Sequence, residues 1–172
     1  MSTQEVTTST STHTLHGKWD LYYHLPLNKK WDAASYKVIS REFSTMEHVV
    51  ALNTNIPEKI VKLCMLFVMR DGIKPMWEDP QNRNGGCFSF KVLNKQVFDV
   101  WKHLFYSICG ETLFTDSKLN KNVNGITTSP KKNFCIVKVW LRDCSIQDPS
   151  LLISIPELSK QGCLFKRHAP EF

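Results

Sequence analysis

The sequence predicts a single α+β domain, built from a mainly antiparallel sheet with helices on one face. Three observations indicate this class: strand-like segments outnumber helical ones, several links between strands are short, and the helices are interspersed among the strands. With 172 residues and 42% hydrophobic content, the chain has the size of one globular domain. We expect residues 1–12, which are rich in Ser and Thr, to form a disordered tail, and residues 13–172 to form the domain.

The first elements follow from local patterns of apolar residues. Residues 19–25 and 35–43 resemble strands joined by a polar link. The sequence STME at residues 44–47 resembles a capping box and predicts a helix to about residue 53. A nearly continuous apolar run over residues 62–70 is typical of a central strand buried on both faces.

The second half contains the most regular helical pattern of the chain. Alternation over residues 88–92 predicts a half-buried strand. Apolar residues then recur at helical spacing over residues 95–109, and Gly110 is placed to end that helix. The remaining expected elements are strands at residues 122–128, 134–141 and 162–168, and a helix that begins near Asp148-Pro149.

Composition excludes several classes of protein. The net charge of +6 favours an anionic partner. Six cysteines are spread singly without a C-x-x-C pair, so we expect free thiols and neither a metal nor another cofactor. We find no apolar run of about 18 residues and no secretory signal pattern, so we expect no membrane span and a cytoplasmic protein. Neither clustered carboxylates for a catalytic metal nor a glycine-rich cofactor turn is present, which argues against an enzyme.

Two tryptophans stand in polar loops rather than in a core pattern. Trp77 lies between Pro75 and Pro80, and Trp31 is flanked by lysines and Asp32. A large aromatic side chain in such a loop exposes much apolar area unless something covers it. Trp77 could fold back onto the sheet as a lid; alternatively, the two loops could place their indoles face to face as a slot for a flat ligand.

Glu78, directly after Trp77, suggests which flat ligand such a slot would bind. Guanine offers two N–H donors on one edge that a carboxylate can accept together, whereas adenine and cytosine do not offer that pair. Methylation at N7 makes the ring cationic, which adds on the order of 0.5–2 kcal/mol per indole contact. The methyl group then becomes a determinant of specificity.

The segment DGIKPMWED, residues 71–79, resembles the D-G-I-x-P-M-W-E-D motif of the eukaryotic translation initiation factor 4E family, which binds the messenger RNA cap. This long motif is specific, and the resemblance covers nearly the whole chain. Further matches are His13-Thr14-Leu15, Trp19, Trp31, Asn94-Lys95-Gln96, Trp101, Gly110-Glu111 and Trp140.

The resemblance implies a curved sheet backed by three helices on its convex face, with the cap on the concave face. It implies that Trp31 and Trp77 stack on 7-methylguanosine, that Glu78 reads the guanine edge, and that Trp140 lies beside the N7 methyl. Packing in the core is the alternative for Trp140. The implied function is recruitment of capped messenger RNA to the translation initiation machinery by a monomer. A cap-binding repressor or storage factor, or a general single-stranded RNA binder without cap specificity, are the alternatives.

The sequence departs from the family where phosphate would bind. Cys87 stands where the family usually has an arginine after the Gly-Gly pair. Lys131 and Lys132 lie where family residues help to bind the cap triphosphate, although such a charged turn is often merely solvated. Lysine offers a point charge rather than a bidentate fork, so the phosphate contacts should be salt-sensitive. Further candidates for phosphate contacts are Arg83, Lys138 and Arg142.

A second departure concerns the helical face, where the family binds a scaffold of the 4G type or 4E-binding repressors. Val50 stands where the family has a tryptophan of its first helix, so partner choice or affinity should differ, unless a smaller residue sits in a preserved groove. Such departures resemble protozoan members of the family, trypanosomatid ones included, whose caps carry additional methyl groups. The candidate residues of this face are His13, Leu15, Glu47 and Val50.

Overall fold

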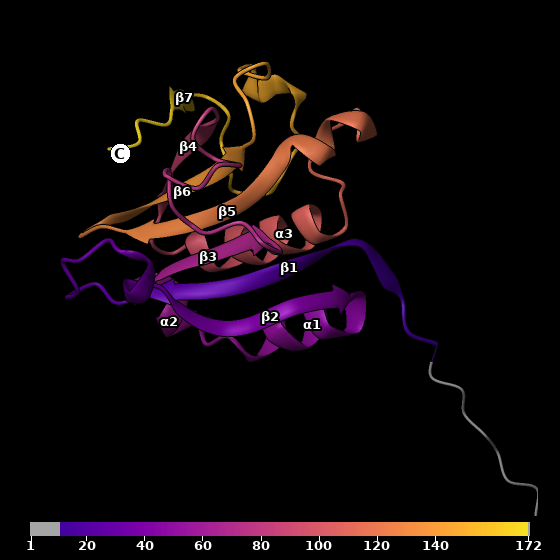
Figure 1. Ribbon diagram of the computed structural model, residues 1–172, viewed down its shortest axis with the longest axis horizontal. Coiled ribbons are helices and arrows are strands. Elements are labelled where there is room, and N and C mark those ends of the chain that lie inside the picture. Colours follow the sequence, from indigo (N-terminus) through magenta and orange to yellow (C-terminus); the bar gives the residue numbers. More distant parts are fainter. Residues whose placement is uncertain (1–10, 172) are drawn as a thin grey trace, which may run out of the picture.

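The computed structural model describes residues 11–171, so most of the expected tail at residues 1–12 lies outside the described residues. Seven antiparallel strands form one sheet in the order β2-β1-β3-β5-β6-β4-β7. Figure 1 shows this sheet as strongly twisted and curved. The strands are β1 (Thr14–His24), β2 (Lys37–Thr45), β3 (Met65–Arg70), β4 (Gly86–Leu93), β5 (Val123–Pro130), β6 (Phe134–Leu141) and β7 (Leu164–Arg167).

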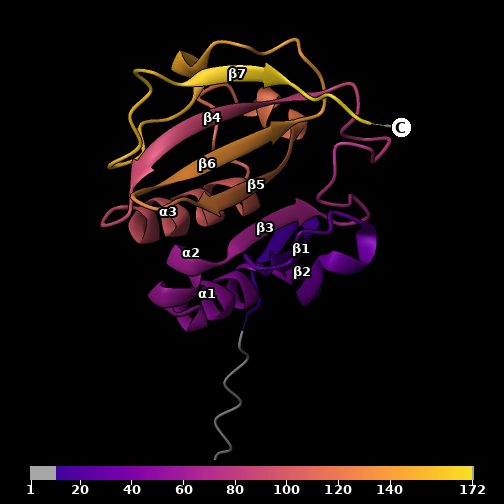
Figure 2. The ribbon, with the colours of Figure 1, turned by 90° about the vertical axis from the view of Figure 1, so that its left-hand side faces the viewer.

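Three α-helices cover the convex side of the sheet, whereas two loops and the C-terminal end lie at the other side (Figure 2). Three short 3₁₀ turns complete the described chain. The fold predicted from the sequence is thereby confirmed. The helices are α1 (Met46–Asn55), α2 (Glu58–Leu63) and α3 (Val97–Cys109), and the 3₁₀ turns are η1 (Ala33–Ser35), η2 (Ser117–Asn122) and η3 (Pro149–Leu151).

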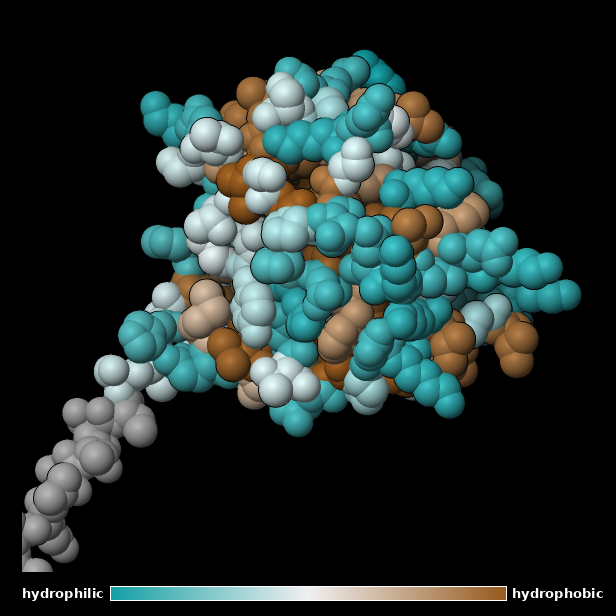
Figure 3. All heavy atoms as spheres, turned by 180° about the vertical axis from the view of Figure 1, so that it is seen from behind, coloured by the Kyte–Doolittle hydropathy of each residue, from teal (hydrophilic) through white to brown (hydrophobic). Residues whose placement is uncertain are grey.

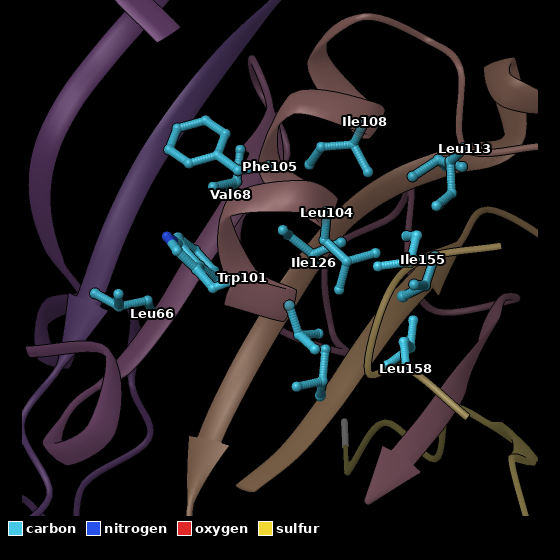
Figure 4. Packing of buried hydrophobic residues seen from close by; sticks show 14 of the residues in the cluster. Leu66, Val68, Trp101, Leu104, Phe105, Ile108, Leu113, Ile126, Ile155 and Leu158 are labelled. Atoms are coloured by element: carbon cyan, nitrogen blue, oxygen red, sulfur yellow. The ribbon is translucent and has the colours of Figure 1, made fainter. Parts of the chain in front are cut away.

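The main core lies between the sheet and the longest helix, α3. One face of α3 is fully buried and packs on strands β3 and β5, as Figure 4 shows for Trp101, Leu104 and Phe105 against Leu66 and Ile126. Burial of such side chains contributes about 1.5–3 kcal/mol each, which makes α3 the main support of the sheet.

A second, smaller apolar cluster lies on the sheet face that the helices leave uncovered, which we call the open face. It contains Tyr22, Phe67, Met69, Ile73 and Trp140. Because side chains of a strand alternate between faces, the neighbours of these residues along each strand belong to the main core. The open face therefore has its own apolar cluster, with the aromatic side chains of Tyr22, Phe67 and Trp140.

Three sequence-based expectations about elements are wrong. The capping box at residues 44–47 does not form, because Thr45 rather than Ser44 caps α1 and the Glu47 carboxylate binds His13 instead. Lys62 and Leu63 belong to helix α2 rather than to the following strand, because α2 buries Val61 and a short apolar run does not by itself distinguish helix from strand. The helix expected at Asp148-Pro149 is only the turn η3, since Leu152 already returns to extended backbone. Asp148 does cap this turn, by accepting a hydrogen bond from the Ser150 N–H.

The surface seen from behind the view of Figure 1 is mostly hydrophilic, with small separate apolar spots (Figure 3). Among the helices of residues 11–171, none has the length and apolar character needed to cross a bilayer. All six cysteines are free thiols.

Candidate functional site

The loop that carries Trp77 is held by two buried polar side chains. The Asp79 carboxylate accepts hydrogen bonds from the N–H groups of Lys74 and Gln81, each at 2.9 Å. The Asn82 amide donates to the carbonyls of Lys74 and Met76, also at 2.9 Å. Because buried polar groups of this kind are costly to leave unpaired, these bonds fix the path of the backbone around Trp77.

Trp77 itself is half-buried at the edge of the open face. The His168 imidazole stacks on its indole, with ring centroids 5.8 Å apart and an interplanar angle of 16°. The Lys138 Nζ atom lies 5.9 Å from the centre of the same indole. Thus Trp77 does not stand free in solvent: it packs against the apolar cluster of the open face, outside the main core.

Trp31 has a similar arrangement in the other loop. Its indole stacks on His24 with ring centroids 4.1 Å apart and an interplanar angle of 5°, yet 53% of the residue remains exposed. The Nε2 atom of His24 lies 2.8 Å from the Lys30 carbonyl, which ties the imidazole to the loop. Each of the two loop tryptophans is therefore backed by a histidine.

Trp140 lies below these loops in strand β6. It is only 4% exposed, and its Nε1 donates a hydrogen bond to the Thr127 hydroxyl at 2.7 Å. Its ring is 4.9 Å from that of His168. Trp140 therefore packs on the open face rather than in the main core, next to the histidine that contacts Trp77.

The carboxylate of Glu78 faces polar and aromatic neighbours. It accepts a 3.4 Å hydrogen bond from the backbone N–H of Glu171. Burial, followed by the charge of Glu78 and then that of Asp32, raises the pKa of Tyr36 to about 12. The site thus contains a carboxylate that accepts an N–H donor beside an indole, as the reading of a guanine edge requires.

Sequence reasoning missed His168, although the ring of this residue lies against both Trp77 and Trp140. It is buried, and its Nδ1 lies 2.6 Å from the Asn82 carbonyl, so Nδ1 must carry the proton. Burial, together with the nearby charge of Lys138, lowers the pKa of His168, although the Asn82 hydrogen bond opposes this shift. No local pattern marks His168, because its partners stand far away in the sequence.

The family profile of eukaryotic initiation factor 4E matches residues 14–164, which include the two tryptophan loops. The chain belongs to this family. A relative from Schizosaccharomyces pombe, eukaryotic translation initiation factor 4E-2, is 31% identical over 147 residues, or 80% of this chain. A homolog from Acanthamoeba polyphaga mimivirus is 48% identical over 63 residues, or 37% of this chain. The chain spans 57% and 23% of the lengths of these two relatives.

A solved structure of another family member has the same fold. It is the complex of C. elegans eIF4E-3 with the 4E-binding protein Mextli and a cap analog, with a TM-score of 0.71 and 27% identity. The match covers 82% of this chain and 80% of that chain. The curved sheet described above is therefore the fold of the 4E family.

The candidate phosphate ligands of this family member do not lie together. Lys138 is near the Trp77 ring, as described. Lys131 and Lys132 instead lie at the tip of the β5–β6 hairpin, where the Lys131 N–H bonds to the Phe134 carbonyl. Phe134 and Trp140 are six positions apart, a distance of about 20 Å along a strand. The two hairpin lysines are thus remote from Trp140, and they lie at the end of the sheet where β1 ends at His24, the residue that stacks on Trp31. Arg83 follows the Trp77 loop, and Arg142 directly follows β6.

Cys87, which replaces the usual family arginine, lies on the open face in strand β4, between Trp140 and Lys166 on the neighbouring strands. It is 2% exposed, and burial raises the pKa of its thiol above the ordinary value. The side chain is therefore a neutral thiol that offers a phosphate no positive charge.

On the helical side, the predicted residues of the family's partner-binding face lie close to one another. The His13 Nδ1 lies 2.6 Å from the Glu47 carboxylate, which also accepts the His13 backbone N–H. Leu15 packs against the core, and Val50 on α1 is 44% exposed. The start of β1 is thereby attached to the first turn of α1. In the described part of the chain, no group of three metal-ligating side chains is close enough to hold a metal ion.

Proposed function

We propose that this chain binds the 7-methylguanosine cap of messenger RNA and brings capped RNA to the translation initiation machinery. The observation that carries the proposal is the pair of histidine-backed tryptophans, Trp31 and Trp77, with the Glu78 carboxylate beside the second. Family membership and the cap analog bound to C. elegans eIF4E-3 support it.

The assigned roles follow from the chemistry of a methylated guanine. Trp31 and Trp77 would each stack on the cationic base through the indole face opposite their histidine. Glu78 accepts the N1 and N2 protons in place of the Glu171 N–H. Trp140 and His168 line the end of the site, near the N7 methyl, and Lys138 meets the first phosphates. The chain acts without catalysis, as a monomer in the cytoplasm.

The second partner we propose is a protein that binds the helical side. Mextli in the C. elegans complex is a 4E-binding protein, so a scaffold of the 4G type or a 4E-binding repressor would use the surface around His13, Glu47 and Val50. Because Val50 lacks the area of an aromatic anchor, we expect this chain to favour partners that rely less on one central contact.

Fluorescence titration tests the cap site. We expect 7-methylguanosine triphosphate to quench the tryptophan emission at concentrations at which unmethylated guanosine triphosphate does not. Trp77→Ala and Glu78→Gln should each weaken binding at least about tenfold, since a lost stack or charge-assisted bond costs about 1.5–3 kcal/mol. Glu58→Gln, which removes a carboxylate on α2, is the matched control and should bind as the unaltered chain does.

Equal affinity for the methylated and unmethylated nucleotides would reject the cap proposal. It would favour a general single-stranded RNA binder, which does not need Glu78. If cap binding holds, partner capture separates initiation from repression: recovery of a large scaffold together with a helicase indicates initiation.

A further inference from the structure

A second feature of the open face extends away from the tryptophans along three adjacent strands. In β6, β4 and β7 the side chains alternate between the main core and the open face. Figure 2 shows these three strands side by side. The ten open-face residues, which we call the basic strip, are Phe134, Ile136, Lys138 and Trp140 of β6, Cys87, Ser89, Lys91 and Leu93 of β4, and Leu164 and Lys166 of β7.

The basic strip carries three positive charges and no negative one. Lys138 pairs with Ser89, and Lys166 pairs with Cys87, the residue two places before Ser89 on the same face. Lys91, two residues after Ser89, is the next open-face residue of β4. At this end Glu157, which contacts Gln96, lines a depression of about 380 Å³ together with Lys91 and Leu93 of the strip. A chain of anionic groups could therefore contact successive lysines along the strip.

Apolar side chains are interleaved with these lysines. The Lys91 Nζ atom lies 4.6 Å from the centre of the Phe134 ring, which is half-buried. Leu93 is 48% exposed and Leu164 is 57% exposed. A partly exposed aromatic ring among lysines, as Phe134 provides, suits a surface that binds single-stranded nucleic acid, because bases stack while lysines contact phosphates.

The basic strip is continuous with the proposed cap site. Trp140 and Lys138 belong to both, and the strip then runs about 20 Å to Phe134. Lys131 and Lys132, at the tip of the β5–β6 hairpin, extend the positive charge beyond Phe134. An RNA whose cap is bound at Trp77 would have its first nucleotides over this surface.

We propose that the basic strip binds the first transcribed nucleotides of capped RNA, with their phosphates on Lys166 and Lys91 and a base on Phe134, beyond the cap phosphates at Lys138. This inference rests on the proposed function, because the cap sets the register of the RNA. The strip should therefore increase the affinity for capped RNA but not the affinity for a free cap nucleotide.

Titration with RNAs of increasing length tests this inference. The unaltered chain should bind a short capped RNA at least about tenfold more tightly than 7-methylguanosine triphosphate, since one base stack contributes about 1–3 kcal/mol. Phe134→Ala, and separately Lys91→Ser with Lys166→Ser, should remove most of this gain while binding the free cap nucleotide unchanged. Unchanged nucleotide binding also shows that the variants are folded.

The matched control replaces two lysines outside the strip, Lys59 on α2 and Lys118 in η2, with serine. It should retain the gain with RNA length. The salt dependence gives a second readout: loss of two phosphate contacts should reduce the slope of log K against log salt by about 1.4. The control should leave that slope unchanged.

The outcomes separate the two proposals. If the cap nucleotide binds but added nucleotides give no gain, the strip proposal fails and the cap proposal stands. If the methylated nucleotide does not bind preferentially, the cap proposal fails. The strip proposal then fails as well, because it depends on the cap to position the RNA. If polyglutamate removes the gain as effectively as uncapped RNA does, the strip is only a basic surface and the inference is overturned.

Discussion

The imidazole ring of His168 lies against both Trp77 and Trp140. Its neutral form is favoured, because burial lowers its pKa below the ordinary value of 6.5. In the unfolded chain the same ring gains a proton near pH 6.5, so below that pH the unfolded state binds more protons than the folded state. The contribution of neutral His168 to the free energy of unfolding is therefore fully present above pH 6.5 and is lost as the pH falls below it.

We predict that His168→Gln reduces this pH dependence. Thermal unfolding of both proteins between about pH 7.5 and 5.5 measures it, since only the unaltered chain contains the shifted group. The His48→Gln variant, which alters an exposed histidine on α1, should keep the dependence of the unaltered chain. Parallel losses of stability in the His168→Gln and unaltered chains would show that His168 does not titrate as described.

Some residues of the site can be identified from their neighbours in the sequence, whereas others cannot. Trp31, Trp77 and Glu78 stand out because large aromatic side chains in polar loops demand an explanation. His168 gives no such signal: Asn82 precedes it by 86 residues, and only the sheet brings them together. The same is true of Lys166, whose position beside Cys87 depends on the pairing of β7 with β4. Contacts between distant segments are what local patterns do not encode.

At the level of elements, the Gly85-Gly86 pair determines how β4 meets its neighbours. A Cβ atom at Gly86 would lie 2.5 Å from the Phe165 Cζ and 2.7 Å from the Lys166 carbonyl oxygen, closer than atoms normally approach. At Gly85 the Leu141 carbonyl oxygen would be 1.9 Å away. Glycine is required here for close approach of strands, not for an unusual backbone angle.

We predict that Gly86→Ala costs about 1–3 kcal/mol of stability, because the added methyl forces β7 away from β4. Chemical denaturation measures the free energy of unfolding. Displacement of β7 should also weaken cap binding through His168, which follows this strand directly. Ser89→Ala, a change on the same strand that adds no atoms, is the control and should have little effect on either quantity. Equal stability of Gly86→Ala and the unaltered chain would contradict the close packing.

The elements themselves were predictable where one periodicity dominated. Helix α3 has apolar residues at helical spacing from Val97 to Ile108, and it lies where the sequence placed it. The run at residues 62–70, predicted as one strand, is instead the end of α2 followed by β3, and both elements contribute to the same core, through Val61 and Leu66. Proline at the start of η3 suits a helix, but the following residues, Leu152 to Ile155, make no second turn. Tertiary packing decided both cases.

At the scale of the whole molecule, the site joins the two ends of the domain. Trp31 follows the first strand, Trp77 lies in the middle of the chain, and His168 follows the last strand. The sheet order places β1 and β7 far apart, with the open face between them. A site of this kind forms only when the full sheet has formed, so cap binding should report on global folding and not on one local segment.

Truncation at the C-terminal end tests this dependence. We predict that removal of residues 164–172 abolishes cap binding and lowers stability, because β4 loses one of its two neighbouring strands and Trp77 loses His168. Removal of residues 169–172 should leave both intact, since the hydrogen bond that the structure shows for residues 169–171 is the 3.4 Å bond from the Glu171 N–H to Glu78, the acceptor that guanine would use. Cap titration and thermal unfolding of both truncated proteins distinguish the cases. If the longer truncation still bound the cap tightly, His168 would not be part of the site, and stacking on Trp31 and Trp77 would have to suffice by itself.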